Sequence, residues 1–202
     1  MVRIKDKKCY DTPTMEQKHI ITIAGKPGSG KSTASKAVAT QLGFRHFSSG
    51  DFFRAIGRER GIDVFQANLI AEQEQEIDHL VDDHLKKLGT NEDNMVIDSR
   101  MAWHWMPYSF RVYLDLDLLV ASERILKSLD DARMEVEDIP QSAADYAARL
   151  QDRLDSEMRR YKNLYNVNPY NPANYDLVID TAVNSPEVVQ NKIIESFNDW
   201  LK

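Results

Sequence analysis

The stretch Gly25-Lys26-Pro27-Gly28-Ser29-Gly30-Lys31-Ser32 matches the pattern G-x-x-x-x-G-K-S. The short, β-branched run His19–Ala24 precedes it directly, and a helical pattern follows from Ser32 to Leu42, where Gly43 ends it. A buried strand, a glycine-rich turn and a helix in this order are typical of a loop that holds the phosphates of a nucleoside triphosphate. The context on both sides therefore predicts a phosphate-binding loop.

Each part of this loop has a physical task. The glycines let backbone N–H groups turn inward around an anion, and the start of the helix directs its positive dipole end at the phosphates. We expect Lys31 to reach the β- and γ-phosphate oxygens and Ser32 to offer its hydroxyl to Mg²⁺. The predicted nucleotide-binding residues of the loop are Gly25, Pro27, Gly28, Ser29, Gly30, Lys31, Ser32 and Thr33.

Apolar runs and helical patterns alternate along the rest of the chain. Further strands are expected at 44–48, 94–98, 110–114 and 175–180, and further helices at 51–60, 64–88, 118–129, 143–165 and 186–201. This alternation is typical of an α/β protein with a parallel sheet. We therefore predict a P-loop NTPase fold over residues 19–202, with a five-stranded parallel sheet flanked by helices. Residues 1–18 are polar and aperiodic, and they are interpreted as a flexible extension.

Composition narrows the function classes. The 202 residues carry a net charge of −6, which argues against a general nucleic-acid binder because such proteins present a basic face. No stretch has the length and apolarity of a membrane span, and the single cysteine rules out an internal disulfide. These features favour a cytoplasmic protein whose partners are small molecules, with neither nucleic acid nor membrane among them. A monomer is the expectation, although these features do not bear on dimerisation.

Two charged pairs follow predicted strands. Asp51 and Arg54 lie within the stretch 48–54, and Asp98 and Arg100 end the strand at 94–98. Ligands of parallel sheets bind beyond the carboxyl ends of the strands, so both pairs should face the crevice of the phosphate loop. Asp51 could instead cap its helix, and Arg54 could be a solvated surface residue. An acid such as Asp98 commonly orients the water shell of Mg²⁺, and Arg100 could grip a phosphate with two hydrogen bonds.

A polar helix supplies more arginine. Arg149, Arg153, Glu157 and Arg160 recur at spacings of four, four and three, so they share one helix face. The alternative is an exposed helix laced with Arg–Glu pairs. Lysine would serve equally well for such pairing, whereas a stripe of arginine fits a lid that closes over transferring phosphates.

Four segments together resemble those of nucleoside monophosphate kinases. They are GKPGSGKS at 25–32, SSGDFFR at 48–54, IDSR at 97–100 and RLDSEMRRYKNLY at 153–165. The chain is most similar to cytidylate kinases and cytidylate-kinase-like proteins of the short archaeal type, from about His19 to the C-terminus. The resemblance implies transfer of the γ-phosphoryl group of ATP to CMP or dCMP, with Mg²⁺ as cofactor, acceptor-binding helices at about 50–90 and a lid at about 130–165.

The same resemblance assigns roles to individual residues. It implies that Asp51, Arg54, Arg100 and Glu157 bind the acceptor, that Ser32 and Asp98 serve the metal, and that Arg124 packs on the donor base. The residues that it implies for catalysis are Lys31, Asp98, Arg153 and Arg160. Ser99 stands where the family usually has glycine, and Trp103 replaces a small residue, which bears on the specificity for the acceptor base.

Two other functions remain open from the sequence. A kinase acting on a hydroxyl would need a general base, for which Asp51 or Asp98 would serve. A nucleotide-binding regulatory protein with negligible turnover is the second, although Asp98 argues against it. The five histidines show no spacing typical of a metal site or a catalytic triad, and the aromatic group Trp103, His104 and Trp105 could either shape the base pocket or belong to the core.

Overall fold

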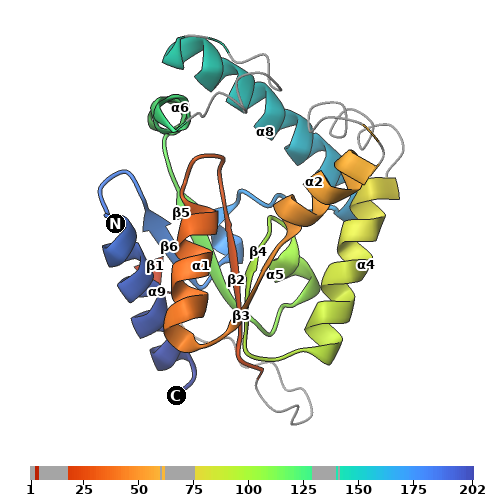
Figure 1. Cartoon of the computed structure of the whole chain (residues 1–202), viewed down its shortest axis with the longest axis vertical. Helices are drawn as coiled ribbons and strands as arrows, with labels where there is room; N and C mark the ends of the chain where they lie inside the picture. The colour runs from red at the N-terminus through yellow and green to blue at the C-terminus, as the bar shows by residue number, and fades with distance from the viewer. Residues whose placement is uncertain (1–2, 5–17, 60, 62–75, 129–139, 141) are drawn as a thin grey trace.

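The structure, a computed structural model, describes residues 3–4, 18–59, 61, 76–128, 140 and 142–202. Its strands form a sheet in the order β1-β6-β5-β2-β4-β3 (Figure 1). Their bounds are Arg3–Ile4 for β1, Ile20–Gly25 for β2, Arg45–Ser48 for β3, Met95–Asp98 for β4, Phe110–Asp115 for β5 and Leu177–Asp180 for β6. The strands β2 to β6 are parallel, which confirms the five predicted strands and the parallel sheet.

The strand β1 corrects the prediction in one respect. Arg3 pairs with Val178 and Ile4 with Leu177, so a sixth, antiparallel strand borders the sheet within the segment predicted to be a flexible extension. Two residues are too few to show the alternation by which strands are found in a sequence. The remainder of that segment up to residue 17 lies outside the described residues.

The described helices lie where the sequence predicts them, apart from two short additions. Their bounds are Lys31–Leu42 for α1, Ser49–Glu59 for α2, Glu76–Asn91 for α4, Ala102–Trp105 for α5, Leu118–Lys127 for α6, Ala143–Tyr165 for α8, Pro172–Asn174 for the 3-10 helix η1 and Pro186–Trp200 for α9. The predicted helix at 64–88 is confirmed from residue 76, and its earlier part lies outside the described residues. The additions α5 and η1 are too short to give a helical period.

The sheet is buried on both faces, as its run of β-branched residues requires. Alternate residues of β2 point to opposite sides: Ile21 and Ile23 pack with α1 and α9, whereas Ile20 packs with α4 and α5. Ala24 joins an aromatic cluster with Tyr113 and other side chains beside it. Because β2 lies between β4 and β5, the crossover direction reverses at this strand. Such a reversal opens a crevice at the carboxyl ends of the strands.

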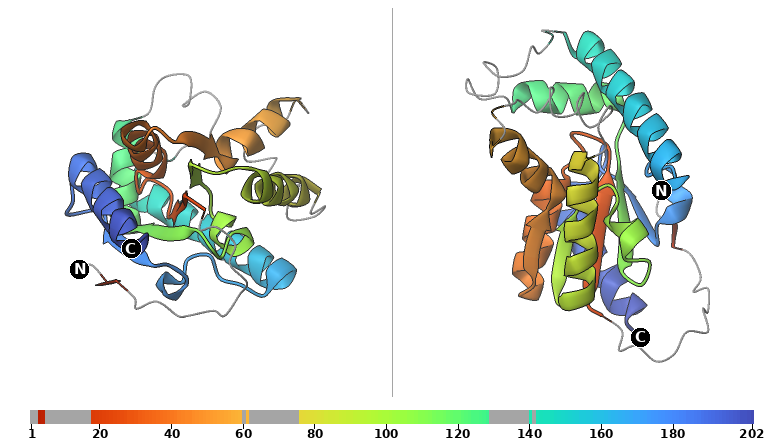
Figure 2. Two further views of the ribbon diagram at one scale, coloured as in Figure 1. Left: turned by 90° about the horizontal axis from the view of Figure 1, so that it is seen from below. Right: turned by 90° about the vertical axis from the view of Figure 1, so that its right-hand side faces the viewer.

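Three helices surround that crevice. Figure 1 shows α2, α6 and α8 at the end of the sheet where β2 meets α1, with the C-terminus of the chain at the opposite end. The two further views in Figure 2 show α6 and α8 lying across this end of the molecule. The helices α6 and α8 pack through an apolar cluster that includes Ala121, Tyr146 and Leu150. Among the described residues, no helix combines the length and the apolar character needed to cross a membrane.

Candidate active site

The phosphate loop connects β2 to α1 and depends on its glycines. At Gly25 (φ 153°) a Cβ atom would lie 2.3 Å from the carbonyl oxygen of Leu114, because β2 pairs with β5 at this point. At Gly28 (φ 73°) a Cβ would lie 3.0 Å from the carbonyl oxygen of Ala121 on α6. Both positions combine a backbone that favours glycine with a close approach. The loop is thus pressed against β5 and α6 and keeps its shape.

Lys31 begins α1 and lies across this loop. Its Nζ donates a hydrogen bond of 2.8 Å to the carbonyl oxygen of Lys26. Burial and then the positive charge of Arg100 lower the pKa of Lys31 to about 8, although Asp98 and Glu157 act in the opposite direction. A bound polyphosphate would raise this pKa again, because nearby anions favour the protonated amine. The Lys31 side chain therefore fits the predicted phosphate-binding role.

The loop and the strand beside it present oxygen atoms that could bind a nucleotide and its metal ion. The hydroxyl of Ser29 is buried and has no hydrogen-bond partner among the described residues. The hydroxyl of Ser32 donates to Asp98 Oδ2 at 2.7 Å, since the pairing of β2 with β4 brings Asp98 beside the loop. Mg²⁺ prefers such oxygen ligands and usually takes one or two from the protein and the rest from phosphates and water. In the described ranges no group of three or more His, Cys, Asp or Glu could hold a metal by itself.

The first two turns of α2 hold the first predicted acceptor pair. Arg54 Nη2 forms an ion pair with Asp51 Oδ1, and the backbone N–H of Asp51 donates to the hydroxyl of Ser48 at 3.2 Å. Partial burial opposes the charge on Asp51, but the Arg54 guanidinium keeps the pKa of this carboxyl below its usual value. Asp51 therefore orients Arg54, while Ser48 provides the hydrogen bond at the start of the helix.

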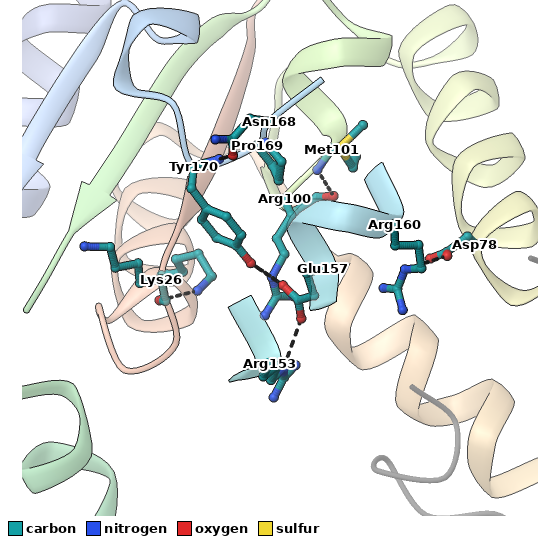
Figure 3. A network of polar contacts seen from close by, with 12 residues as sticks. Lys26, Asp78, Arg100, Met101, Arg153, Glu157, Arg160, Asn168, Pro169 and Tyr170 are labelled. Carbon is teal, nitrogen blue, oxygen red and sulfur yellow. Dashed lines mark hydrogen bonds and ion pairs between the residues drawn. The ribbon is translucent and has the colours of Figure 1, made fainter. Parts of the chain in front are cut away.

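A cluster around one buried carboxylate joins Arg100 to α8 (Figure 3). Glu157, whose side chain is 4% exposed, accepts from Arg153 Nε at 3.0 Å and pairs with Arg100 Nε at 2.8 Å. The hydroxyl of Tyr170 also donates to Glu157 and accepts from Arg100 Nε. Burial opposes the charge on Glu157, yet Arg100 and Arg153 lower its pKa to about 2. One carboxylate thus fixes two arginines beside the loop.

Comparison with known proteins agrees with this geometry. Residues 20–183 match the model of the cytidylate kinase-like family. The chain belongs to this family. It is 35% identical over 188 residues to a cytidylate kinase of Natronomonas pharaonis, covering 90% of both chains. It is also 35% identical over 189 residues to a cytidylate kinase of Methanocaldococcus jannaschii, covering 91% of this chain and 99% of that protein.

The fold of this cytidylate kinase-like chain is also similar to that of solved structures. A shikimate kinase from Acinetobacter baumannii superimposes with a TM-score of 0.57 at 18% identity, covering 91% of this chain and 95% of the other. A gluconokinase from Sinorhizobium meliloti gives a TM-score of 0.56 at 13% identity, covering 92% and 95%. At such identities the likeness concerns the fold, and it confirms the predicted P-loop kinase architecture.

In this cytidylate kinase-like chain, the last predicted lid residue has a partner of its own. Arg160 Nε lies 3.0 Å from Asp78 Oδ2 on α4, and each side chain is 8% exposed. Burial raises the pKa of Asp78 to about 6, although the Arg160 charge opposes this. The predicted stripe on α8 is therefore divided, because Arg153 and Glu157 face Arg100 whereas Arg160 faces α4. Neither Asp78 nor Tyr170 is predicted from the sequence.

The other predicted site residues lie around the same crevice. Arg124 Nη2 donates to the carbonyl oxygen of Thr181 at 2.7 Å, which places it against the loop after β6. Trp103 is buried, stacks obliquely on Tyr175 and donates from Nε1 to the carbonyl oxygen of Arg100 at 2.8 Å. The core alternative therefore holds for Trp103, which supports the backbone of Arg100 from behind. Ser99, which stands where the family usually has glycine, is also buried.

Proposed function

We propose that this chain is a nucleoside monophosphate kinase that transfers the γ-phosphoryl group of ATP to CMP or dCMP, giving ADP and the diphosphate. The observation that carries the proposal is the pair Arg100 and Arg153, gathered on the buried Glu157 next to the phosphate loop. Cations at this place suit an acceptor that is itself a phosphate. Membership of the cytidylate kinase-like family and the activity named for its relatives support the same conclusion.

The reaction then consists mainly of positioning and charge neutralisation. The acceptor phosphate is an anionic nucleophile at neutral pH, so the chain needs no general base. Lys31 and the loop amides would hold the donor phosphates, and Ser32 and Asp98 would hold Mg²⁺, which neutralises charge on those phosphates. Arg54 and Arg100 would grip the acceptor phosphate.

The remaining arginines would act on the donor and the transferring group. Arg153 and Arg160 would reach the transferring phosphoryl group as the lid closes, and Arg124 would pack on the donor base. Residues at about 50–90 would form the acceptor-binding segment and those at about 130–165 the lid. We place this activity in the cytoplasm and in a monomer acting on small molecules.

An acceptor panel tests the proposal. ADP release is followed with Mg-ATP and, in separate reactions, CMP, dCMP, UMP, AMP, GMP, shikimate and gluconate. We expect CMP or dCMP to give the highest kcat/KM and replacement of Mg²⁺ by EDTA to abolish turnover, because the metal neutralises the phosphate charges. Turnover only with a hydroxyl acceptor would instead assign Asp51 or Asp98 as a general base. ATP binding without turnover of any acceptor would favour a regulatory protein.

Arg54→Ala tests the acceptor site separately from the donor site. Loss of a phosphate-binding guanidinium should raise the KM for CMP by about tenfold or more, because a charge-assisted hydrogen bond contributes about 1.5–3 kcal/mol. The KM for ATP should stay within about twofold, since the donor phosphates bind at the loop. Steady-state kinetics with each substrate varied in turn measures both values.

Arg58→Ala is the matched control for this variant. Arg58 lies one turn later on α2 and is exposed, so its removal should leave both KM values within about twofold. If Arg54→Ala raises only the KM for ATP, or if both variants behave alike, Arg54 does not bind the acceptor phosphate.

A further inference from the structure

Three arginines of the crevice share one manner of pairing. Within the described ranges, the ion pairs that they make with acids all lie at Nε: Arg100 and Arg153 with Glu157, and Arg160 with Asp78. Arg153 Nε donates a hydrogen bond to its acid, whereas Arg160 Nε and Asp78 Oδ2 are in ion-pair contact without a hydrogen bond. A guanidinium carries further donors on its two Nη atoms. An acid on the Nε side of a guanidinium attracts that side of the group and leaves most of the Nη donors for an anion such as a phosphate. These acids therefore do more than neutralise the arginines: they also orient the Nη donors of each arginine.

Arg111 and Asp176, at the amino ends of β5 and β6, pair in a contrasting, structural way. Arg111 donates from Nε to Asp176 Oδ2 at 2.9 Å and from Nη2 to Asp176 Oδ1 at 2.6 Å. Both carboxylate oxygens and two guanidinium nitrogens are used in that contact, which links β5 to the segment before β6. Fork-to-fork pairing of this kind suits a fixed tie between two segments. The acids of the crevice do not pair in this way.

Asp78 is the acid in this group whose role the proposed mechanism leaves open. It comes from α4, whereas its partner Arg160 comes from α8, so the pair spans the two sides of the crevice. Figure 3 shows Asp78 on one side of the Arg160 guanidinium and the outer nitrogens directed away from it. The Tyr161 ring lies 5.2 Å from the guanidinium carbon and limits its movement further.

The surroundings of Asp78 make burial of its ionised carboxylate unfavourable. Besides Arg160, the charged or titratable groups that act on it are Asp82 and His79 of α4 and Glu157 of α8. Two of these are acids that disfavour its ionised form. A buried ion pair of this kind is often less stabilising than apolar side chains of the same volume. Stability alone is therefore a weak reason for an acid at position 78.

We propose that Asp78 is a positioning residue, whose carboxylate attracts the Nε side of Arg160 through the buried ion pair so that the Nη atoms of Arg160 face the transferring phosphoryl group. The assignment rests on the proposed function, because it presumes that Arg160 contacts a phosphate. It adds the acceptor-side helix α4 to the machinery that orients the lid helix α8. Asp78 acts only through Arg160 and touches neither substrate.

Three variants and one control test this role, each by its kcat with saturating Mg-ATP and CMP. Arg160→Met should lower kcat by about a hundredfold and Asp78→Asn by about tenfold or more, as expected for loss and for misorientation of a transition-state donor. Asp78→Leu combined with Arg160→Met replaces the pair by apolar side chains, which buried pairs often tolerate. Its kcat should equal that of Arg160→Met within about twofold, because a residue that acts through Arg160 has no effect once Arg160 is gone.

Asp82→Asn is the matched control on the same helix. Asp82 is as buried as Asp78 and also joins α4 to neighbouring elements, but its partners are Trp105 Nε1 and the hydroxyl of Tyr165. Its loss should lower the unfolding temperature and leave kcat within about twofold. If Asp82→Asn lowers kcat as strongly as Asp78→Asn, Asp78 serves only the packing of α4 against α8.

Each remaining outcome decides one question. Equal kcat for the parent protein and Asp78→Asn would overturn the positioning role. If Asp78→Asn does not fold, the double variant decides, since a kcat about tenfold below that of Arg160→Met would mean that Asp78 acts independently of Arg160. Absence of turnover by the parent protein with every nucleoside monophosphate would overturn the proposed function itself, which separates the two failures.

Discussion

Lys31→Ala should lower kcat for phosphoryl transfer by about a thousandfold, the largest effect expected of a single change in this chain. Lys31 lies across the phosphate loop, where its Nζ donates 2.8 Å to the carbonyl oxygen of Lys26. In the proposed reaction this ammonium stabilises the negative charge of the transferring group. Loss of one such donor lowers kcat by about a hundred- to a thousandfold. The low pKa of about 8 also shows that its charge is poorly compensated before a nucleotide binds.

The fold should survive this substitution. The side chain contributes one hydrogen bond to the free protein, and its removal also relieves a repulsion from Arg100, so stability should change by no more than about 1–2 kcal/mol. Coupled ADP release measures kcat, and urea unfolding measures stability. Lys87→Ala, at an exposed position of α4, is the control and should match the parent protein in both. A kcat for Lys31→Ala within tenfold of the parent would exclude the loop as the donor site.

The parts of the site that the sequence predicts are those whose residues are neighbours along the chain. The phosphate loop is eight consecutive residues between a strand and a helix, so its conformation follows from local requirements for glycine and from the start of α1. The same is true of Asp51 with Arg54, and of Arg153 with Glu157, which lie one helical turn apart. Four of the five parallel strands are short runs rich in apolar residues, whereas β3 holds only one apolar side chain, Phe47.

What the sequence did not reveal depends on contacts between distant segments. Tyr170 and Glu157 meet because the chain turns back after α8, and nothing in the pattern around Tyr170 distinguishes it from the neighbouring aromatic residues. Asp78 looks like any polar residue of an amphipathic helix until α8 is seen to cover it. The division of the α8 stripe, with Arg160 directed to α4, likewise depends on how the helices pack rather than on their spacing.

The resemblance to cytidylate kinases led to the correct family, but the role of Trp103 became clear only from the structure. Trp103 stands where the family usually has a small residue, and it could have filled a base pocket. Instead it lies in the aromatic cluster with Tyr113 and Tyr175, and its indole nitrogen holds the backbone of Arg100. The substitution is thus explained by packing behind Arg100, the residue proposed to bind the acceptor phosphate.

Glu157→Gln should impair both stability and catalysis. The carboxylate is ionised in the folded protein down to a pKa of about 2, against an ordinary value of 4.5, because Arg100 and Arg153 outweigh the cost of its burial. The gap between these values corresponds to about 3 kcal/mol of stability near neutral pH. In the variant, Arg100 stays largely buried without its acid, and Arg153 loses the group that orients it. We therefore expect kcat to fall by about tenfold or more.

The dependence on pH has a definite sign. Since the pKa of Glu157 is lower in the folded than in the unfolded chain, its contribution is complete above about pH 5 and is lost as the pH falls from 4.5 toward 2. The difference in unfolding free energy between the parent protein and Glu157→Gln should therefore be constant from pH 7 to about 5.5 and shrink at pH 4 and 3. Urea unfolding of both proteins at each pH measures it.

Asp176→Asn separates the two effects of Glu157. Asp176 forms the fork-to-fork pair with Arg111 at the amino ends of β5 and β6, the end of the sheet opposite the crevice. Its loss should therefore lower stability by at least about 1 kcal/mol and leave kcat within about twofold. If Glu157→Gln behaves in the same way, with stability lowered and kcat preserved, Glu157 is a structural acid like Asp176. If kcat falls only in Glu157→Gln, the buried carboxylate does more than hold α8 to the sheet, because the same loss of charge at Asp176 does not affect phosphoryl transfer.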